Sequence, residues 1–181
     1  MRRDAKVRRD ALIAAGAEIF TERGYKVPLD EVATRAGVGR GTLYRNFKDR
    51  EALALAIFES EIERIQQTVA AGHDLRKSMI DVALVTARGT SLYARIAADL
   101  VADTANMAAF RALGDRLAQA LAPLADRARA SGDVGSDTDG WKLSIALRMV
   151  SNVYHDFDDE AVALRNLNDA LDLLLDGLRP R

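Results

Sequence analysis

Residues 29–48 read LDEVATRAGVGRGTLYRNFK, and this stretch decides what fold the N-terminal part of the chain can have. Its first part carries apolar side chains at helical spacing, namely Leu29, Val32, Ala33 and Ala36. Gly37-Val38-Gly39 interrupts that pattern, and Leu43 and Phe47 then predict a second helix of barely two turns, from residue 40 or 41 to about residue 47. A helix, a glycine-containing turn and a second short helix form a helix-turn-helix unit, whose second helix enters the major groove of DNA.

Single residues of the stretch meet the physical needs of such a unit. Ala33 is small enough for the two helices to approach closely, Gly37 permits the bend with a positive φ, and Val38 can fill the space between the helices. The side of the second helix that faces away from the core offers hydrogen-bond donors for phosphate oxygens and base edges: Arg40, Thr42, Tyr44, Arg45 and Lys48.

The flanking sequence predicts two further helices. An apolar pattern with Leu12, Ile19 and Phe20 indicates a first helix that stops at Gly24, and Pro28 suits the first turn of the helix that follows. After the second short helix, an amphipathic stretch runs from about Asp49 to near residue 72. We therefore expect a three-helix domain with the helix-turn-helix at residues 1–50.

The remaining sequence also favours helices. Alanine and leucine are abundant while proline and aromatic residues are scarce, which is typical of an all-α fold. The apolar periodicity predicts helices near residues 75–88, 91–101, 107–131, 137–153 and 158–178. The fold expected is all-α with about nine helices, in which residues 51–181 form a helical domain for ligand binding and dimerisation.

The charge distribution is uneven along the chain. Residues 1–50 carry twelve Lys or Arg against seven Asp or Glu, a net charge of +5, whereas the remainder is net negative. A basic N-terminal domain favours binding to a polyanion such as nucleic acid, although small helical domains also show such a charge imbalance by chance. The basic residues Arg2, Arg3, Lys6, Arg8 and Arg9 precede the first apolar pattern; they could touch phosphates or the minor groove, or form a solvated, disordered end.

Several classes of site are excluded or disfavoured. The chain has no cysteine, which excludes disulfides, thiolate metal sites and thiol switches and fits a reducing cytoplasm. The apolar run after the basic N-terminus ends at Glu18, so we expect no export signal, and no run approaches the roughly 18 apolar residues of a membrane span. His155 beside Asp156 is interpreted as a solvated loop rather than a metal site. The sequence therefore predicts a cytoplasmic protein with no metal, no cofactor and no membrane contact.

The stretch LDEVATRAGVGRGTLYRNFKDREAL, residues 29–53, resembles the signature of the TetR family of transcriptional regulators. Ile19-Phe20 and Arg23-Gly24 in the preceding helix also match, so the resemblance covers about the first sixty residues. The leucine-rich last helix, ending GLRP, resembles SbtR-like C-terminal domains. The chain departs from the family pattern where many members have Ser or Thr at Pro28, Ser at Gly39 and His at Asn46.

The resemblance implies roles for the residues of the second short helix. Thr42, Tyr44 and Lys48 would contact phosphates, while Arg40, Gly41 and Arg45 would read bases or touch the groove wall. Asn46 can bond adenine with two hydrogen bonds, so the target sequence can differ from that of relatives with histidine there. Leu43 and Phe47 would belong to the core.

The resemblance also implies a dimer in which the last two helices of each subunit form a four-helix interface. The last helix carries a wide leucine stripe, which could equally belong to the core of one subunit: Leu164, Leu167, Leu171, Leu174, Leu175 and Leu178. Apolar and aromatic residues of the central helices are candidates for a ligand pocket, although most of them are expected to be ordinary core: Phe58, Ile62, Met79, Tyr93, Ile96, Met107, Phe110, Trp141, Ile145 and Met149.

The sequence thus favours a repressor that binds a palindromic double-stranded DNA operator as a homodimer and is released by a largely apolar small molecule. A DNA-binding activator or a ligand-independent factor would have the same sequence features. An all-helical enzyme is the alternative of a different class, but no Ser-His-acid pattern or metal-ligand spacing supports one. We expect no catalytic residue.

Overall fold

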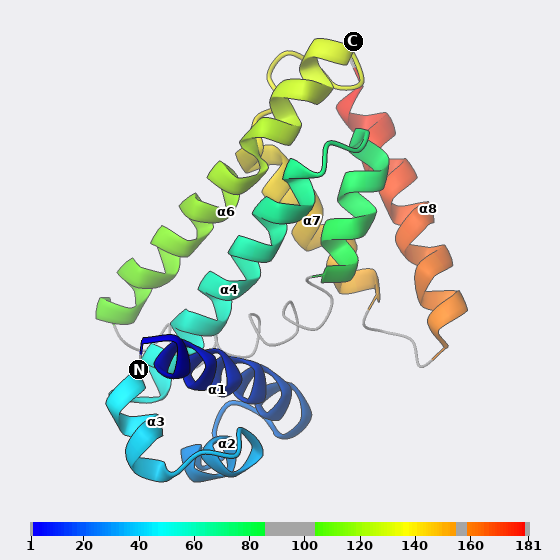
Figure 1. The fold of residues 1–181 in the computed structure, drawn as a ribbon. Coiled ribbons are helices and arrows are strands. Elements are labelled where there is room, and N and C mark those ends of the chain that lie inside the picture. Colours follow the sequence, from blue (N-terminus) through cyan, green and yellow to red (C-terminus); the bar gives the residue numbers. More distant parts are fainter. Residues whose placement is uncertain (1, 86–103, 155–158, 180–181) are drawn as a thin grey trace. The chain divides into compact units, whose positions relative to one another are not determined.

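The computed structural model describes residues 2–85, 104–154 and 159–179, and within these ranges the regular elements are all helices (Figure 1). The predicted all-α fold is confirmed. The helices are α1 (Arg2–Arg23), α2 (Leu29–Arg35), α3 (Arg40–Asn46), α4 (Arg50–Ala70), α6 (Thr104–Ser131), α7 (Gly140–Tyr154) and α8 (Glu160–Leu178). Residues 75–85 are helical as well. The helix expected at residues 91–101 lies outside the described residues.

Helix α1 differs from the expectation at its N-terminus. It begins at Arg2, so the basic residues before Leu12 form its first turns, and the disordered end considered from the sequence is wrong. Alanine, arginine and lysine are good helix formers, and Asp4 in the first turn complements the positive end of the helix dipole. The cations of this segment are therefore presented on a helix.

The described residues divide into two compact units: residues 2–60 and 104–110 belong to the N-terminal unit, and residues 61–85, 111–154 and 159–179 to the C-terminal unit. The expected domain boundary lay earlier, at residue 50. Helix α4 is continuous from Arg50 to Ala70 and α6 from Thr104 to Ser131, so each of these helices has residues in both units.

In the N-terminal unit, helices α1, α2 and α3 pack on one another (Figure 1). Leu12, Ile19 and Phe20 of α1 are buried, as are Val32 and Ala33 of α2 and Leu43 of α3. Arg50 begins α4 and donates to the backbone carbonyls of Tyr25 and Val27, the latter at 2.6 Å. The start of α4 is thus tied to the connection between α1 and α2.

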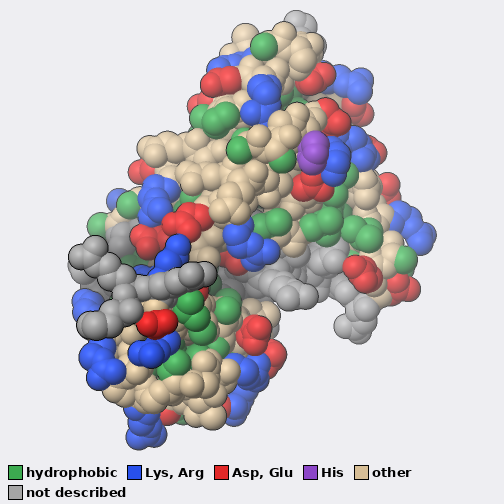
Figure 2. Space-filling view, viewed as in Figure 1, with side chains coloured by type: hydrophobic (Ala, Val, Ile, Leu, Met, Phe, Trp, Pro, Cys, Tyr) green, Lys and Arg blue, Asp and Glu red, His purple; other side chains and the backbone are tan. Residues whose placement is uncertain are grey.

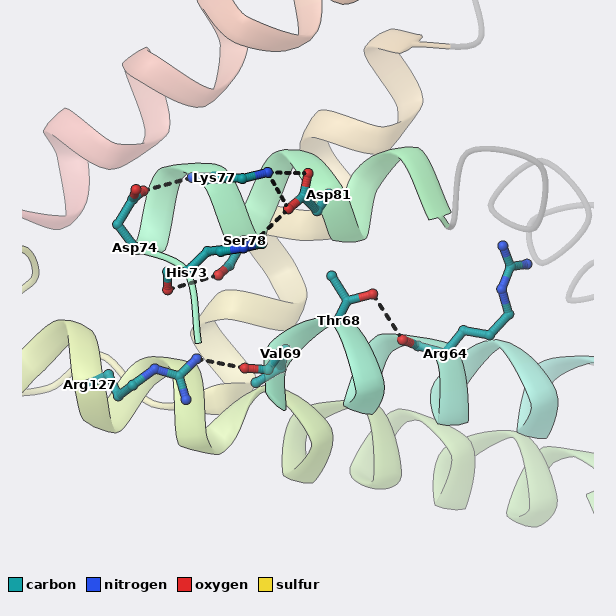
Figure 3. Close-up of polar contacts among 9 residues, drawn as sticks. All are labelled: Arg64, Thr68, Val69, His73, Asp74, Lys77, Ser78, Asp81 and Arg127. Atoms are coloured by element: carbon teal, nitrogen blue, oxygen red, sulfur yellow. Dashed lines mark hydrogen bonds and ion pairs between the residues drawn. The ribbon is translucent and has the colours of Figure 1, made fainter. Parts of the chain in front are cut away.

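In the C-terminal unit, α7 and α8 pack together and polar contacts fix neighbouring helices. Arg127 of α6 donates through Nη2 to the carbonyl of Val69, 2.8 Å away, near the end of α4 (Figure 3). Arg76 donates to the Asp172 carboxylate and to the Asn168 side chain of α8. These charged hydrogen bonds hold the C-terminal part of α4 against α6 and the helix at 75–85 against α8.

Candidate nucleic-acid interface

The turn between α2 and α3 has the geometry that the sequence predicted. Gly37 has a φ of +66°, a value that a residue with a side chain rarely adopts. The amide of Gly37 donates to Thr34 O at 3.1 Å and that of Val38 to Ala33 O at 3.0 Å, which closes the end of α2. The prediction of a glycine-dependent bend at this position is confirmed.

Two side chains fix α3 to the rest of the unit. Leu43 and Phe47, one helical turn apart, are completely buried, as predicted. The guanidinium carbon of Arg9 on α1 lies 4.9 Å from the centre of the Phe47 ring, within the range of a cation–π contact. Since these two residues turn one side of α3 inward, the other side of this short helix is left to the solvent.

The outward side of α3 carries the residues predicted to contact DNA. Tyr44 is 51% exposed, and Arg40, Gly41, Arg45 and Lys48 are exposed as well. Thr42 and Asn46 are half-buried. No acidic residue lies within α3 itself. The structure therefore brings all seven predicted residues to one short segment.

Hydrogen bonds within α3 direct several of these side chains. Arg45 Nη2 donates to Thr42 Oγ1 at 3.1 Å, and Asn46 Nδ2 donates to Thr42 O at 2.7 Å. A Cβ atom at Gly41 would lie 3.5 Å from Arg45 Nη1, so the guanidinium lies along the helix beside Gly41. The bond to the Thr42 carbonyl uses one of the two hydrogens of the Asn46 amide, while a two-bond contact with adenine uses one N–H and Oδ1.

Two acidic side chains adjoin this segment from outside α3. Asp30, the second residue of α2, forms an ion pair with Arg40 through Oδ2 and Nη2, and Asp49 Oδ2 lies 3.3 Å from Lys48 Nζ. The contact between Asp30 and Arg40 could not be predicted from the sequence, because a separation of ten residues is not a helical spacing. On the face shown in Figure 2, Lys and Arg side chains are spread over α1 to α3, with a few acidic side chains among them.

Other arginines of the N-terminal unit form ion pairs with glutamates of the same unit. Arg35 of α2 donates to Glu22 at 3.1 Å and to Glu18 at 3.3 Å, both on α1. The hydrogen bond to Glu22, followed by the charge of Glu22, raises the pKa of Arg35 above its usual value. Arg23 pairs with Glu31 in the same way. These ion pairs join α1 to α2 and occupy cations that net charge alone would have counted toward DNA binding.

A sequence model described as "Bacterial regulatory proteins, tetR family" matches residues 12–57, which include α2 and α3. The crystal structure of TetR transcriptional regulator SCO0520 from Streptomyces coelicolor is 32% identical to this chain, with a TM-score of 0.70, over 95% of this chain and 98% of that one. The chain belongs to the TetR family of transcriptional regulators.

Other relatives agree with TetR membership. FasR of Mycolicibacterium smegmatis, an HTH-type transcriptional activator, is 37% identical over 59 residues, which are 32% of this chain and 27% of that protein. An HTH-type transcriptional regulator of Staphylococcus aureus is 33% identical over 64 residues, 35% of each chain. The matched segment is thus about a third or less of the length of these curated relatives. A TetR-family structure from Rhodococcus sp., 21% identical with a TM-score of 0.71, shows the same fold over 94% of this chain and 99% of that one.

The ten residues considered for a ligand pocket of this TetR-family chain have different environments. Phe58, Ile62 and Met79 are buried, whereas Trp141, Ile145 and Met149 are exposed on one side of α7. Tyr93 and Ile96 lie outside the described residues; Met107 and Phe110 lie in α6, where their side chains are not described. The six residues whose side chains are described thus divide into three buried ones and three on the solvent-facing side of α7.

Glu61 on α4 is a half-buried glutamate that was not among the predicted site residues. Its Oε1 accepts a hydrogen bond from Arg64 at 3.3 Å, while its Oε2 is buried and has no hydrogen-bond partner. Burial raises the pKa of Glu61, and the charge of Arg64 opposes that shift. The one visible indication in the sequence was an acidic residue next to Ile62 in an otherwise apolar stripe.

The leucine stripe of α8 is only partly buried within the subunit. Leu167 and Leu171 are buried, whereas Leu164, Leu174, Leu175 and Leu178 are half-buried and Leu173 is 77% exposed. The stripe thus serves the core of the subunit in part and leaves apolar surface beside it.

Among the residues that the structure describes, no cluster of His, Asp or Glu could hold a metal ion, and no helix is long and apolar enough to span a membrane.

Proposed function

We propose that this TetR-family regulator binds a palindromic DNA operator as a homodimer and acts as a cytoplasmic repressor that a small molecule releases. The observation that carries the proposal is the short helix α3, which is fixed by buried Leu43 and Phe47 and presents hydrogen-bond donors to solvent. Two such helices at a fixed spacing read two half-sites, which raises the affinity above that of a single short helix. The function proposed is regulation of transcription, with no catalytic step.

On this proposal, the exposed residues of α3 divide between phosphates and bases. Thr42, Tyr44 and Lys48 contact phosphate oxygens, which position the helix, while Arg40 and Arg45 read base edges. Gly41 lets the backbone approach the groove wall closely. Asn46, in place of the common histidine, contributes to reading adenine.

We place the dimer interface on α7 and α8. Trp141, Ile145 and Met149 follow one another at four-residue intervals on α7 and are 46%, 39% and 55% exposed. Arg148 lies 6.0 Å from the Trp141 ring centre and covers part of this side. Large apolar side chains gathered on one helix face mark an interaction surface. Helix α8, which packs on α7, also exposes Leu173. We therefore assign this α7 stripe to the interface instead of to the pocket expected from the sequence.

Replacing Ile145 by glutamate should weaken the dimer on the order of 100-fold, because the two-fold interface would then bury two unpaired charges. The measurement is the dimer dissociation constant from analytical ultracentrifugation. Ala130→Glu, which adds the same charge to an exposed position of α6, is the matched control and should leave the dimer unchanged. A wild-type monomer, or equal dissociation constants for both variants, would contradict the assignment.

For the ligand, we propose a site in the C-terminal unit lined by part of the buried set that includes Ile62 and Met79. Glu61 offers the site a buried oxygen without a hydrogen-bond partner, which a donor on the ligand could satisfy. Because α4 has residues in both units, a ligand that shifts α4 would change the spacing between the two α3 helices of the dimer. Ligand and DNA affinities would then be reciprocally coupled.

The activator FasR supplies a second candidate, since it is 37% identical in the DNA-binding segment. A reporter gene behind the operator distinguishes the two when the regulator gene is deleted. Expression rises on deletion if the protein represses and falls if it activates. A repressor that responds to a ligand should also release the operator in a binding assay with the purified protein.

A further inference from the structure

Asp30 stands on α2, outside the recognition helix, yet its side chain contacts that helix. Its Oδ2 forms an ion pair with Nη2 of Arg40, the first residue of α3. Arg40 occupies the end of the recognition helix whose residues reach base edges in helix-turn-helix proteins. An acidic side chain on the other helix of the motif thus holds a cation that is a candidate base reader.

The ion pair between Asp30 and Arg40 contributes little to the stability of the fold. Both side chains are at least partly in solvent, and exposed ion pairs contribute little to folding because water and salt screen them. The packing of α2 on α3 rests instead on buried side chains such as Val32 and Leu43, and on the turn at Gly37. Stability of the fold therefore does not account for the acidic residue at this position.

The carboxylate restricts the orientation of a long, flexible side chain. An arginine that reads guanine must present two parallel N–H groups to O6 and N7, and ordering it in that pose costs conformational entropy. Asp30 occupies one terminal nitrogen and leaves the other donors of the guanidinium available. Part of the ordering has thus occurred before DNA arrives.

The same negative charge acts in the opposite direction on phosphates. A carboxylate beside the DNA-facing end of α3 reduces attraction to any DNA backbone and partly neutralises Arg40. Asp30 therefore lowers affinity for sequences in which Arg40 has no base partner, while it favours the sequence in which Arg40 finds guanine.

We propose that Asp30 is a specificity-determining residue, which positions Arg40 for one base pair of each half-site and disfavours binding to other DNA. The proposal rests on the function proposed above for α3. It adds a residue of α2 that touches no base.

The test compares Asp30→Asn with Glu31→Gln. Both changes remove one acidic charge from neighbouring residues of α2 with nearly equal side-chain exposure, 33% and 34%, but Glu31 pairs with Arg23 of α1 and not with α3. Dissociation constants are measured for the full-length variants on the selected operator, on operators substituted at each base pair, and on unrelated DNA, at matched salt.

We expect Asp30→Asn to bind unrelated DNA several-fold more tightly and to lose about 10-fold in discrimination at one base pair of each half-site. That base pair should be the one at which Arg40→Ala loses discrimination. In the Arg40→Ala background, Asp30→Asn should cause no further loss there, and Glu31→Gln should leave the discrimination unchanged.

The proposal would be overturned if Asp30→Asn discriminated between base pairs as well as the wild type does. It would also be overturned if Asp30→Asn lost the same discrimination in the Arg40→Ala background as in the wild type. If the wild type binds its operator and only the Asp30 prediction fails, the function of α3 stands. If the wild type selects no DNA, the proposed function itself fails. Thermal unfolding of each variant near the wild-type temperature confirms that the differences arise in binding.

Discussion

Gly140→Ala is expected to lower the free energy of unfolding by about 3 kcal/mol, at the upper end of the usual cost of overpacking. Gly140 is the first residue of α7 and is buried where α7 begins beside α6. A Cβ atom there would clash with Ala118 O and would lie 2.8 Å from Ala122 N, both backbone atoms of α6. Because no side chain can rotate away, the two helices would have to separate. Urea unfolding of the variant and the wild type measures the effect.

Gly177→Ala is the control, since it makes the same chemical change in a helix of the same unit. Nothing lies within 4 Å of a Cβ atom at Gly177, near the end of α8. Alanine is the better helix former by roughly 0.5–1 kcal/mol, so this variant should be as stable as the wild type or slightly more stable. Equal losses at both positions would show that α6 and α7 are not as close as the structure has them.

Phe47→Ala and Tyr44→Ala should have different effects, because the two side chains lie on opposite sides of the recognition segment. Phe47 is buried and lies under Arg9, so its removal should cost about 3–5 kcal/mol and abolish DNA binding by unfolding the N-terminal unit. Tyr44 is exposed, so Tyr44→Ala should change stability by less than about 0.5 kcal/mol while weakening DNA binding on the order of 10-fold.

Denaturant unfolding and fluorescence-anisotropy titrations with operator DNA measure both effects on the same samples. Tyr44→Phe keeps the ring and removes the hydroxyl, so it reports whether a phosphate hydrogen bond accounts for the loss. If Tyr44→Ala destabilised the protein as much as Phe47→Ala, or bound operator like the wild type, the orientation of α3 would be wrong.

The helix-turn-helix could be predicted closely because its determinants are local. A positive φ at Gly37 and the burial of Leu43 and Phe47 follow from turn chemistry and from i, i+4 spacing, and the structure has both. Helix α8 also begins near its predicted start, since Asp159 caps it by accepting hydrogen bonds from the amides of Ala161 and Val162.

The features that escaped prediction depend on tertiary packing. Helix α7 is apolar on two sides, and its sequence does not say that Leu143 and Leu147 are buried while Trp141 and Ile145 face solvent. Periodicity identifies faces, but it does not rank two apolar faces of one helix. The contact of Asp30 with Arg40 likewise exists only because the turn brings the start of α2 to the start of α3.

The most direct test of operator reading by α3 is the selection of DNA from a random pool by the purified protein, followed by titration of the selected site at several salt concentrations. We predict one palindromic site, and for Lys48→Ala a weaker affinity with a salt slope reduced by about one in each half-site. Lys48 is exposed beyond the end of α3, so its loss should leave the fold intact. A pool without an enriched sequence, or a selected site that Lys48→Ala and Tyr44→Ala bind like the wild type, would contradict the assignment of α3 as the operator-reading helix.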